Sequence, residues 1–331
     1  MKDNDFETVK GDEAFYLKKK GNDLIGMLLL HVDDFLMAGS APFVEETTKM
    51  FQNHLTVSKV EDNSFRFVGV DLKLTEKRIE LSMEEYVNAL EEIPVRQEKK
   101  KVLLNSNEMK LLRRITGKIS WLASNCRPDL SFNALKLSMK SKNATIEDIK
   151  YANMTVRKAK NKVSKVSYKF SPSMKDLIVY GLGDASYKAG EKAMGGQMIL
   201  VGSRESKCVY PVFWRSKLIR KVCKSPKDSE TLNLGLLVDL TTHVSNQLQQ
   251  IMHQKCEVKL FTDSLGTLES LASSHQVERR SMRAEIADLK QKLEDGEVQQ
   301  YCWLQDERML ADILTKERKE KIGFDDLLRE N

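Results

Sequence analysis

With 331 residues, of which 41% are hydrophobic and 31% charged, the chain is long enough for two or more domains with real cores. A net charge of +6 mildly favours a polyanionic partner. The five cysteines include no CxxC pair, so neither a zinc site nor a disulfide framework is indicated. The N-terminus lacks the features of a signal peptide, and the longest apolar run near it, residues 24–30, is too short to cross a bilayer. We therefore expect a soluble protein that is not secreted.

Two adjacent carboxylates, Asp33 and Asp34, separate two short apolar runs within residues 24–40. Acidic residues are poor strand formers and costly to bury unless they are paired or bind metal. The pattern therefore predicts a hairpin among the strands of residues 14–40, with both carboxylates at its tip. Carboxylates held in this way can bind a divalent cation. The alternative is a turn with two solvated aspartates, and this segment alone does not decide between them.

The rest of the N-terminal part is predicted to contain a helix and a second hairpin. Residues 42–55 have apolar positions at helical spacing. Residues 65–74 read as one strand, followed by a turn and a second strand at residues 79–82. Ser82, with Glu85 three residues later, predicts a capping box at the start of the next helix.

The middle of the chain is predicted to be a linker followed by helices. Residues 96–102 are a charge run, which is typical of a solvated linker. Residues 107–163 have a mostly helical pattern that breaks at Arg127-Pro128. The proline fits the start of a further helix, because its missing N–H is tolerated in a first turn.

From about Val166 onward the pattern changes to that of an α/β domain. Three apolar strands are followed by a long helix at roughly residues 228–252, a fourth strand, a charged helix, a fifth strand and a last short helix. The strands are expected at residues 177–183, 196–201, 208–214, 256–262 and 297–304, and the two later helices at residues 278–295 and 309–316.

Four carboxylates of this second half occupy comparable places. Asp184 and Asp263 end strands, Glu230 lies near the start of the long helix, and Asp312 opens the short final helix. Element ends at one edge of an α/β sheet converge in space. Four such carboxylates could hold two divalent ions about 4 Å apart, one activating a water and the other stabilising the leaving oxygen of a phosphodiester. Mg²⁺ suits this role because it binds through a few carboxylates, waters and phosphate oxygens.

Each of these acids taken singly also has a structural explanation. Asp184 and Asp263 could be strand-end turn residues, Asp312 a helix N-cap, and Glu230 a first-turn acid on the helix dipole. The order of all four in this topology favours the metal site.

Read together, these segments resemble the pol region of Ty1/copia-type LTR retrotransposons, from the end of the reverse-transcriptase palm through the ribonuclease H domain. His31-Val-Asp-Asp34 resembles the YxDD-type polymerase box. The other matching motifs are Phe67–Val70 and Ile79–Ser82 with Tyr86 for the primer grip, Ile115–Leu122 and Arg127–Asp129 for the connection, and Gly183–Ser186, Asp228–Glu230, Thr262–Ser264 and Leu310–Lys316 for ribonuclease H.

The resemblance implies an α/β fold with a ribonuclease H-like mixed five-stranded sheet and helices, preceded by a partial reverse-transcriptase palm and a helical connection. Residues 1–95 would be the palm part with a primer-grip-like hairpin. Residues 96–165 would be the thumb or connection segment, and residues 166–331 the ribonuclease H-like domain.

The resemblance also implies an activity. Asp184, Glu230, Asp263 and Asp312 match the family's catalytic carboxylates, which use Mg²⁺ or Mn²⁺ to hydrolyse the RNA strand of RNA–DNA hybrids. Asp33 and Asp34 match two of the three metal-binding aspartates of the polymerase. The third belongs on an earlier palm strand than this chain contains, and the fingers are missing as well, so polymerisation by this chain alone is not expected.

The partners implied are an RNA–DNA hybrid or another nucleic acid and the rest of the pol polyprotein, without a membrane or a small-molecule cofactor. The location implied is intracellular, in the cytoplasm within a virus-like particle, in the nucleus, or in both.

The ribonuclease H part departs from the family's pattern at three places. Ser264-Leu-Gly follows Asp263 where Asn-x-Ser is more usual, and Thr231 replaces an aromatic residue. The histidine that some relatives carry shortly before the last aspartate has no counterpart, since His275 comes far too early.

Two alternatives to an active ribonuclease H remain from the sequence. One is a catalytically inactive transposon remnant that acts as a nucleic-acid-binding or interaction module. The other is a DDE transposase or junction nuclease on the same fold, against which the helix-borne Glu230 and the palm-like region argue. The tryptophans Trp121, Trp214 and Trp303 each lie in apolar stretches and are expected in the core, and His31 is expected to be packed or hydrogen-bonded.

Overall fold

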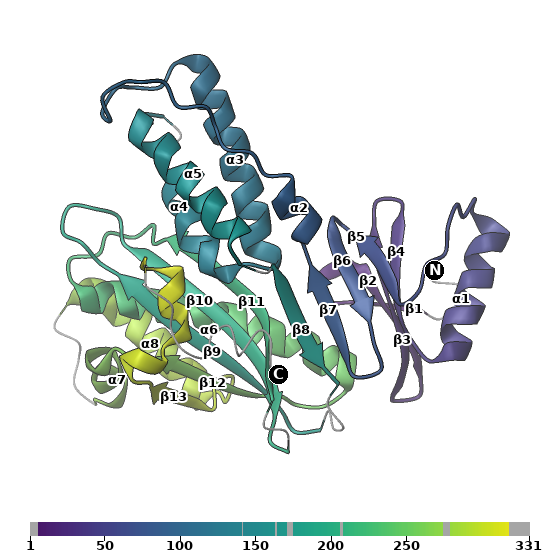
Figure 1. Ribbon diagram of the computed structural model, residues 1–331. Helices are drawn as coiled ribbons and strands as arrows, with labels where there is room; N and C mark the ends of the chain where they lie inside the picture. Colours follow the sequence, from purple (N-terminus) through teal and green to yellow (C-terminus); the bar gives the residue numbers. More distant parts are fainter. Residues whose placement is uncertain are drawn as a thin grey trace.

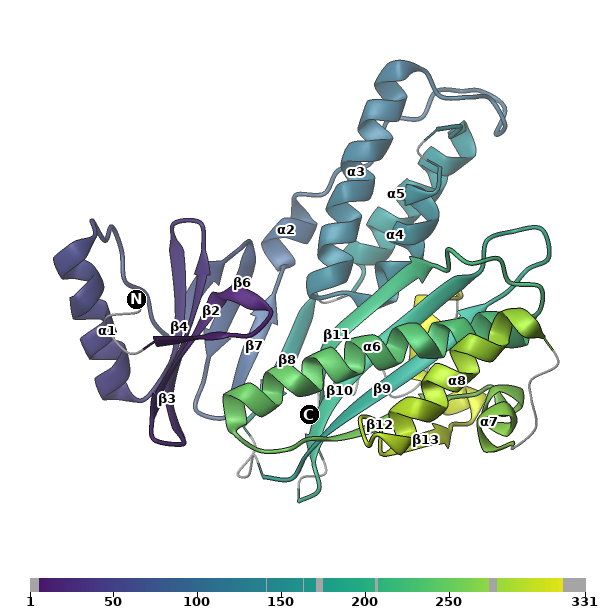
Figure 2. The same ribbon diagram turned by 180° about the vertical axis from the view of Figure 1, so that it is seen from behind.

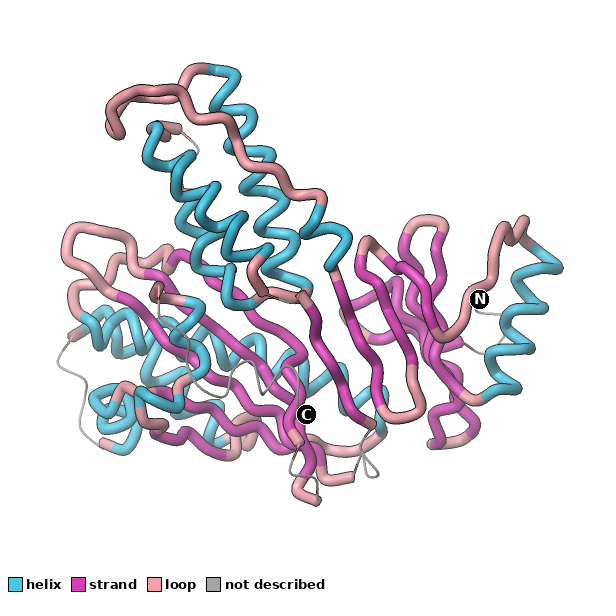
Figure 3. Tube along the Cα trace, in the orientation of Figure 1, coloured by secondary structure: helices cyan, strands magenta, loops and turns pink. Residues whose placement is uncertain are grey.

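The computed structural model describes residues 6–140, 142–162, 164–170, 175–205, 208–273 and 279–317. Figure 1 shows two small sheets formed mainly by the N-terminal part on one side, an α/β unit on the other, and an arm of helices rising between them. Figure 3 shows the same division by secondary structure, with the arm almost wholly helical. Among the described residues, no helix is long and apolar enough to cross a membrane.

The first sheet consists of β1 (Phe6–Val9), β2 (Asp12–Lys20), β3 (Asp23–His31) and β4 (Asp34–Gly39), in that order and antiparallel. Helix α1 (Ala41–His54) packs on it through Phe43, and a Cβ at Gly26 would lie 2.2 Å from the Phe43 ring. The expected hairpin is confirmed, with β3 and β4 joined at Val32-Asp33.

The second sheet has the order β5-β6-β7-β8 and joins distant parts of the chain. It contains β5 (Ser64–Phe67), β6 (Val70–Leu74), β7 (Arg78–Ser82) and β8 (Lys165–Lys169), and β8 comes from beyond the helical arm. The single strand expected at residues 65–74 is wrong. A tight turn at Val68-Gly69, with φ of 48° and 76°, folds this segment into β5 and β6. Val-Gly is not one of the Asn-Gly, Asp-Gly or Gly-Gly pairs that typically mark a two-residue hairpin turn, so the turn was read as part of a strand.

The capping box expected at Ser82 is also wrong. Ser82 is the last residue of β7, and the following helix α2 (Glu84–Asn88) has only five residues and begins after the buried Met83. The Glu85 carboxylate instead accepts a hydrogen bond from Arg66 Nη2 at 2.8 Å. The ion pair between β5 and α2 therefore takes the side chain that a capping box needs.

The arm consists of α3 (Ser106–Asn125), the 3-10 turn η2 (Pro128–Leu130), α4 (Ser131–Ser138) and α5 (Ile146–Lys160). The expected break at Arg127-Pro128 is confirmed. The Arg127 side chain is only 3% exposed, and its Nη1 donates to the Ala159 carbonyl at 2.8 Å and to the Lys162 carbonyl at 3.2 Å. Arg127 therefore closes the C-terminal end of α5, where helix carbonyls have no partner within the helix.

The α/β unit has a sheet with the order β11-β10-β9-β12-β13. Strands β9 (Leu177–Ser186), β10 (Met194–Ser203) and β11 (Val209–Leu218) are antiparallel neighbours, whereas β12 (Glu257–Thr262) runs parallel to β9, and β13 (Gln300–Trp303) runs parallel to β12. This mixed five-stranded sheet with helices confirms the expected fold class.

Helices cover both faces of this sheet. Figure 2 shows α6 (Pro226–Met252) crossing one face, with α8 (Arg280–Glu294) beside it and α7 (Leu265–Ala272) near the edge. Glycine is required on β9 where α6 packs against it, since a Cβ at Gly181 would lie 2.6 Å from Thr241 Oγ1 of α6. The short turns η3 (Asp306–Arg308) and η4 (Leu310–Leu314) follow β13, and η4 contacts β9 and β10.

The largest core cluster joins the arm to the sheet face opposite α6. It runs from α3 and α5 residues such as Leu122 and Val156, through Met198 and Trp214 on the sheet, to Leu314 of η4. The Trp214 indole N–H donates to the Ala123 carbonyl of α3 at 2.7 Å. The expectation of a core position is confirmed for Trp214 but wrong for the other two tryptophans. Trp121 lies on an outer face of α3 and is 40% exposed, and Trp303 lies on the edge strand and is 50% exposed.

Candidate metal centre

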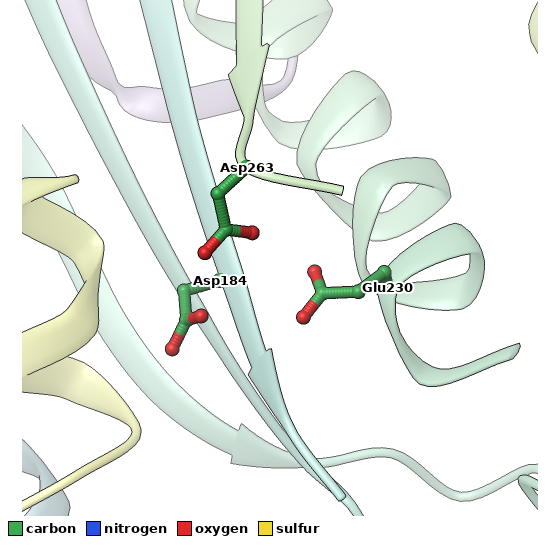
Figure 4. A group of neighbouring side chains, drawn as sticks. All are labelled: Asp184, Glu230 and Asp263. Carbon is green, nitrogen blue, oxygen red and sulfur yellow. The ribbon is translucent and has the colours of Figure 1, made fainter. Parts of the chain in front are cut away.

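Three of the predicted carboxylates meet at one edge of the five-stranded sheet. Asp184 lies near the end of β9, Asp263 directly follows β12, and Glu230 lies in the first turns of α6. Because β9 and β12 are parallel neighbours, their carboxyl ends share an edge, and α6 begins there. One oxygen from each of the three carboxylates lies within 4.8 Å of the other two. Figure 4 shows Glu230 reaching from α6 toward the two strand-borne aspartates.

Burial and mutual repulsion make this group costly without a cation. Burial raises the pKa of Glu230 to about 9, and the charges of Asp184 and Asp263 add to the effect. Its Oε1 accepts a hydrogen bond from the Ala185 backbone N–H at 3.0 Å, whereas its buried Oε2 has no hydrogen-bond partner among the described residues. Such an oxygen fits a cation ligand, because a buried polar atom without a partner is destabilising.

Asp184 is the most enclosed member of the group, with 1% of its surface exposed. Burial raises its pKa to about 6, and the charge of Lys316 and the hydroxyl of Thr315 partly offset that rise. The Thr315 hydroxyl donates to Asp184 Oδ2, and Lys316 Nζ lies 3.3 Å from Asp184 Oδ1. Burial also raises the pKa of Asp263, and repulsion by the charges of Asp312 and Asp306 adds to the rise.

Asp312 belongs to a second, overlapping group. One oxygen each of Asp263, Asp306 and Asp312 lie within 4.8 Å of one another. Asp312 lies in η4 and is fully buried, and Asp306 begins η3. Sequence reasoning missed Asp306, although it follows β13 closely, and β13 is a parallel neighbour of β12. The strand-end rule used for Asp263 would have placed Asp306 at the same edge.

Lys316 is a further site residue that sequence reasoning did not single out. Its Nζ lies 3.3 Å from both Asp184 Oδ1 and Asp312 Oδ1. Burial alone would lower the pKa of this ammonium, but the two carboxylates outweigh it and the net shift is upward. Lys316 is therefore an internal counter-ion of the acidic group.

A buried amide network fixes the backbone at Asp184. Asn233 of α6 donates from Nδ2 to the carbonyls of Asp184 at 2.9 Å and of Gly196 at 3.2 Å. Gln197 donates to the Asn233 amide oxygen and accepts from Arg215 Nε at 2.7 Å. Asn233 thus ties the ends of β9 and β10 beside Asp184 to α6.

Two of the departures from the family pattern lie behind the carboxylates. Thr231 Oγ1 lies 3.3 Å from Thr267 Oγ1, and Ser264 Oγ lies 2.9 Å from the same atom. These hydroxyls connect the starts of α6 and α7, so the substitutions build a small polar contact there. His275 lies outside the described residues.

The polymerase-like aspartates lie elsewhere. Asp33 and Asp34 occupy the exposed tip of the β3–β4 hairpin, next to Val32 with a φ of 54°. Over the described ranges, neither belongs to a group of three potential ligands. His31 is exposed rather than buried, and its ring meets Phe67 edge-on at 6.3 Å between centroids.

The donor set of the C-terminal site suits a hard divalent cation. All candidate ligands in the two groups are carboxylate oxygens, the type that Mg²⁺ and Mn²⁺ prefer. Asp184, Glu230 and Asp263 would hold one ion. Asp263, Asp306 and Asp312 form the overlapping group.

Comparisons with known proteins found similarities to solved structures. No family model matches the sequence, and no curated protein matches it. Among solved structures, LC11-RNase H1 isolated from compost is 15% identical over 43% of this chain and 93% of its own, with a TM-score of 0.32. The N-terminal RNase H domain of rv2228c from Mycobacterium tuberculosis is 15% identical over 42% of this chain and 91% of its own, with a TM-score of 0.31.

A longer match reaches into the N-terminal part. The foamy viral protease-reverse transcriptase in complex with RNA/DNA hybrid is 16% identical over 89% of this chain, with a TM-score of 0.48. This chain covers 37% of that protein. The five-stranded unit has the mixed sheet with helices that the sequence resemblance implied.

Proposed function

We propose that the C-terminal unit is a metal-dependent ribonuclease H that hydrolyses the RNA strand of RNA–DNA hybrids. The observation that carries the proposal is the meeting of Asp184, Glu230 and Asp263 within 4.8 Å, with a buried Glu230 oxygen left without a hydrogen-bond partner. Carboxylates from three separate elements are brought together here at a free-energy cost that a bound cation would offset.

The residues of the chain divide the work between binding and positioning. Divalent cations at this site would polarise the phosphate and generate a hydroxide nucleophile. Asp184, Glu230 and Asp263 would hold them, with Asp312 completing the set. Asn233 and the Ala185 N–H fix Asp184 and Glu230 in place. Lys316 would move aside or pair with a phosphate oxygen once the cations neutralise the aspartates.

The finer assignments belong to the same proposal. Mg²⁺ is the proposed ion, with Mn²⁺ as a substitute. In this view residues 1–95, 96–165 and 166–331 correspond to the palm end, connection and ribonuclease H parts of a Ty1/copia-type pol protein. Asp33 and Asp34 would then be polymerase-box residues that do not polymerise by themselves in this chain. An intracellular location, in the cytoplasm or nucleus, and association with other pol segments are proposed on the same resemblance.

The test is cleavage of a hybrid whose RNA strand is labelled, by the full chain, in Mg²⁺ and in EDTA. We expect cleavage of the RNA strand in Mg²⁺ alone and a loss of roughly two orders of magnitude or more in Asp184→Asn. Circular dichroism of the variant would check that it is folded. Cutting that persists unchanged in Asp184→Asn would contradict the proposal.

The same assay addresses the inactive-module alternative. Tight hybrid binding by the wild-type chain that is independent of Mg²⁺, without cleavage in either Mg²⁺ or Mn²⁺, would favour a nucleic-acid-binding module. Cleavage that requires the metal and is lost in the variant would rule that module out.

A further inference from the structure

An exposed tryptophan stands beside the carboxylates. Trp303 is the last residue of β13, the edge strand of the sheet, and half of its surface is exposed. Its indole N–H donates to the backbone carbonyl of Asp263 at 3.3 Å. The bond holds the indole against the residue that both carboxylate groups share.

The sheet register explains why the ring lies at the rim of the site. Thr262, the residue before Asp263, is the register partner of Trp303 in the parallel β12–β13 pair. The next step of the same ladder is the bond from the Leu304 N–H to the Thr262 carbonyl at 3.0 Å. Three residues after Trp303, Asp306 joins the group with Asp263 and Asp312. The chain therefore passes from the exposed ring directly into the acidic site.

An exposed indole at this point suits an anionic polymer. The acidic edge repels phosphates wherever cations do not bridge them, so part of the grip on a nucleic acid there has to come from neutral contacts. A flat apolar ring offers such a contact, and the groove of an A-form-like hybrid that displays the sugars is wide and shallow enough to admit it.

We propose that Trp303 is a substrate-contacting residue, whose indole packs against the sugars of the hybrid next to the phosphate held by the carboxylates. The inference rests on the proposed ribonuclease H function, because it takes the hybrid as the ligand of this site. It makes Trp303 a determinant of hybrid affinity, separate from the metal ligands.

A purely structural role makes a different prediction. If Trp303 acts only by anchoring Asp263 through its N–H, then phenylalanine, which keeps a flat apolar ring but lacks the donor, should be as defective as alanine. If the ring contacts the hybrid, phenylalanine should retain most of the affinity. The pair Trp303→Phe and Trp303→Ala therefore separates contact from anchoring.

The experiment measures fluorescence anisotropy of a labelled RNA–DNA hybrid titrated with the full chain in Ca²⁺, with gel analysis verifying that the hybrid stays intact. Trp303→Ala is expected to weaken binding roughly fivefold to tenfold, and Trp303→Phe no more than about twofold. In Mg²⁺, Trp303→Ala should raise KM by a similar factor with kcat little changed. Phe170→Ala is the matched control: it truncates an aromatic residue that is 51% exposed just after β8, and it should bind as the wild type does.

Alanine and wild-type proteins with equal affinity would overturn the inference, as would a phenylalanine variant as weak as alanine. These outcomes are distinct from failure of the proposed function. A wild-type chain that cuts hybrids but ignores the Trp303 substitutions keeps the function and loses the inference. A chain that binds hybrids through Trp303 but cuts none in Mg²⁺ or Mn²⁺ loses the function and keeps the inference.

Discussion

Single side chains at the carboxylate edge cost stability that the proposed cation binding would restore. Glu230 keeps one oxygen without a hydrogen bond, and Asp184 relies on Lys316 and Thr315 for compensation. Proteins tolerate such groups where a ligand restores the balance. The free energy of unfolding, measured with and without metal, therefore tests the role of each residue in metal binding independently of catalysis.

Glu230→Gln should have little effect on the metal-free protein. With a pKa raised to about 9, the Glu230 carboxyl is protonated at neutral pH, so an amide of the same shape changes the free energy of unfolding by no more than about 1 kcal/mol. The variant should lose the stabilisation that Mn²⁺ gives the wild type. Urea unfolding in EDTA and in Mn²⁺ measures both effects, and equal Mn²⁺ stabilisation of the two proteins would contradict the ligand role.

Lys316→Gln should show the opposite behaviour. Removing the ammonium leaves Asp184 and Asp312 less compensated, which should lower the metal-free stability by roughly 1 kcal/mol. Because the lysine no longer competes for the same oxygens, Mn²⁺ should stabilise this variant more than it does the wild type. The control is Lys188→Gln, which removes a lysine whose one ion pair within the described part of the chain is with the exposed Glu191. Weaker stabilisation of Lys316→Gln than of the wild type by Mn²⁺ would show that the lysine does not compete with the cation for the carboxylate oxygens.

At the scale of elements, Arg127 connects three parts of the helical arm. Its guanidinium pairs with Asp129 at 2.8 Å and donates to the carbonyls at the end of α5. The Arg-Pro-Asp sequence that marked the connection segment therefore has a structural role: the arginine closes one helix, while the proline and aspartate begin the next turn.

Arg127→Ala should destabilise the arm by about 3 kcal/mol, because it leaves Asp129 and several helix-end carbonyls without their donor. Arg157→Ala on α5 removes an exposed arginine that, among the residues the structure describes, pairs with Glu92 alone, and it should cost less than about 1 kcal/mol. Thermal and urea unfolding of both variants give the comparison. An equal loss of stability in the two variants would show that the buried contacts of Arg127 contribute no more to stability than the exposed ion pair of Arg157.

The ion pair between Arg127 and Asp129 makes the stability of the arm depend on pH. Burial opposes ionisation of Asp129, but Arg127 outweighs it and the pKa of Asp129 is lowered overall. A carboxyl with a lowered folded-state pKa contributes stability above its unfolded value of about 4, and this contribution is lost as pH falls through the folded-state pKa. Asp129→Asn should therefore be less stable than the wild type at pH 7, with the difference shrinking below about pH 4. Unfolding curves from pH 7 to pH 3 test the sign.

Local patterns in the sequence predicted most elements, because hydrophobic periodicity depends only on neighbouring residues. They identified the order of the C-terminal strands and helices apart from α7, and the three carboxylates of the first group. The β5–β6 turn was missed because Val68-Gly69 is not one of the residue pairs that typically mark a two-residue hairpin turn. Asp306 was missed because the strand-end rule was not applied to β13, whereas Lys316 was missed because its place depends on the course of η4, which no local pattern encodes.

At the scale of the whole molecule, the α/β unit shares a hydrophobic core with the helical arm but, over the described residues, not with the first sheet. The largest core cluster includes Leu122 of α3 and Met198 of β10, whereas Leu28, although fully buried in the first sheet, belongs to none of the three clusters formed by the described residues. The first sheet reaches the α/β unit through polar contacts such as the Lys10 N–H to Gln250 Oε1 bond at 2.7 Å.

This difference in packing predicts which elements are destabilised when a buried leucine is truncated. Leu122→Ala and Leu28→Ala each remove a fully buried leucine side chain, and each should cost about 2–5 kcal/mol locally. Leu122→Ala should speed amide hydrogen exchange in α3 and also in β10 and β11, because the cavity opens in the core they share. Leu28→Ala should speed exchange within β1–β4 and leave β9–β12 protected. Exchange measured by mass spectrometry on the full chain distinguishes the patterns, and faster exchange in β9–β12 caused by Leu28→Ala would show that the two units unfold together.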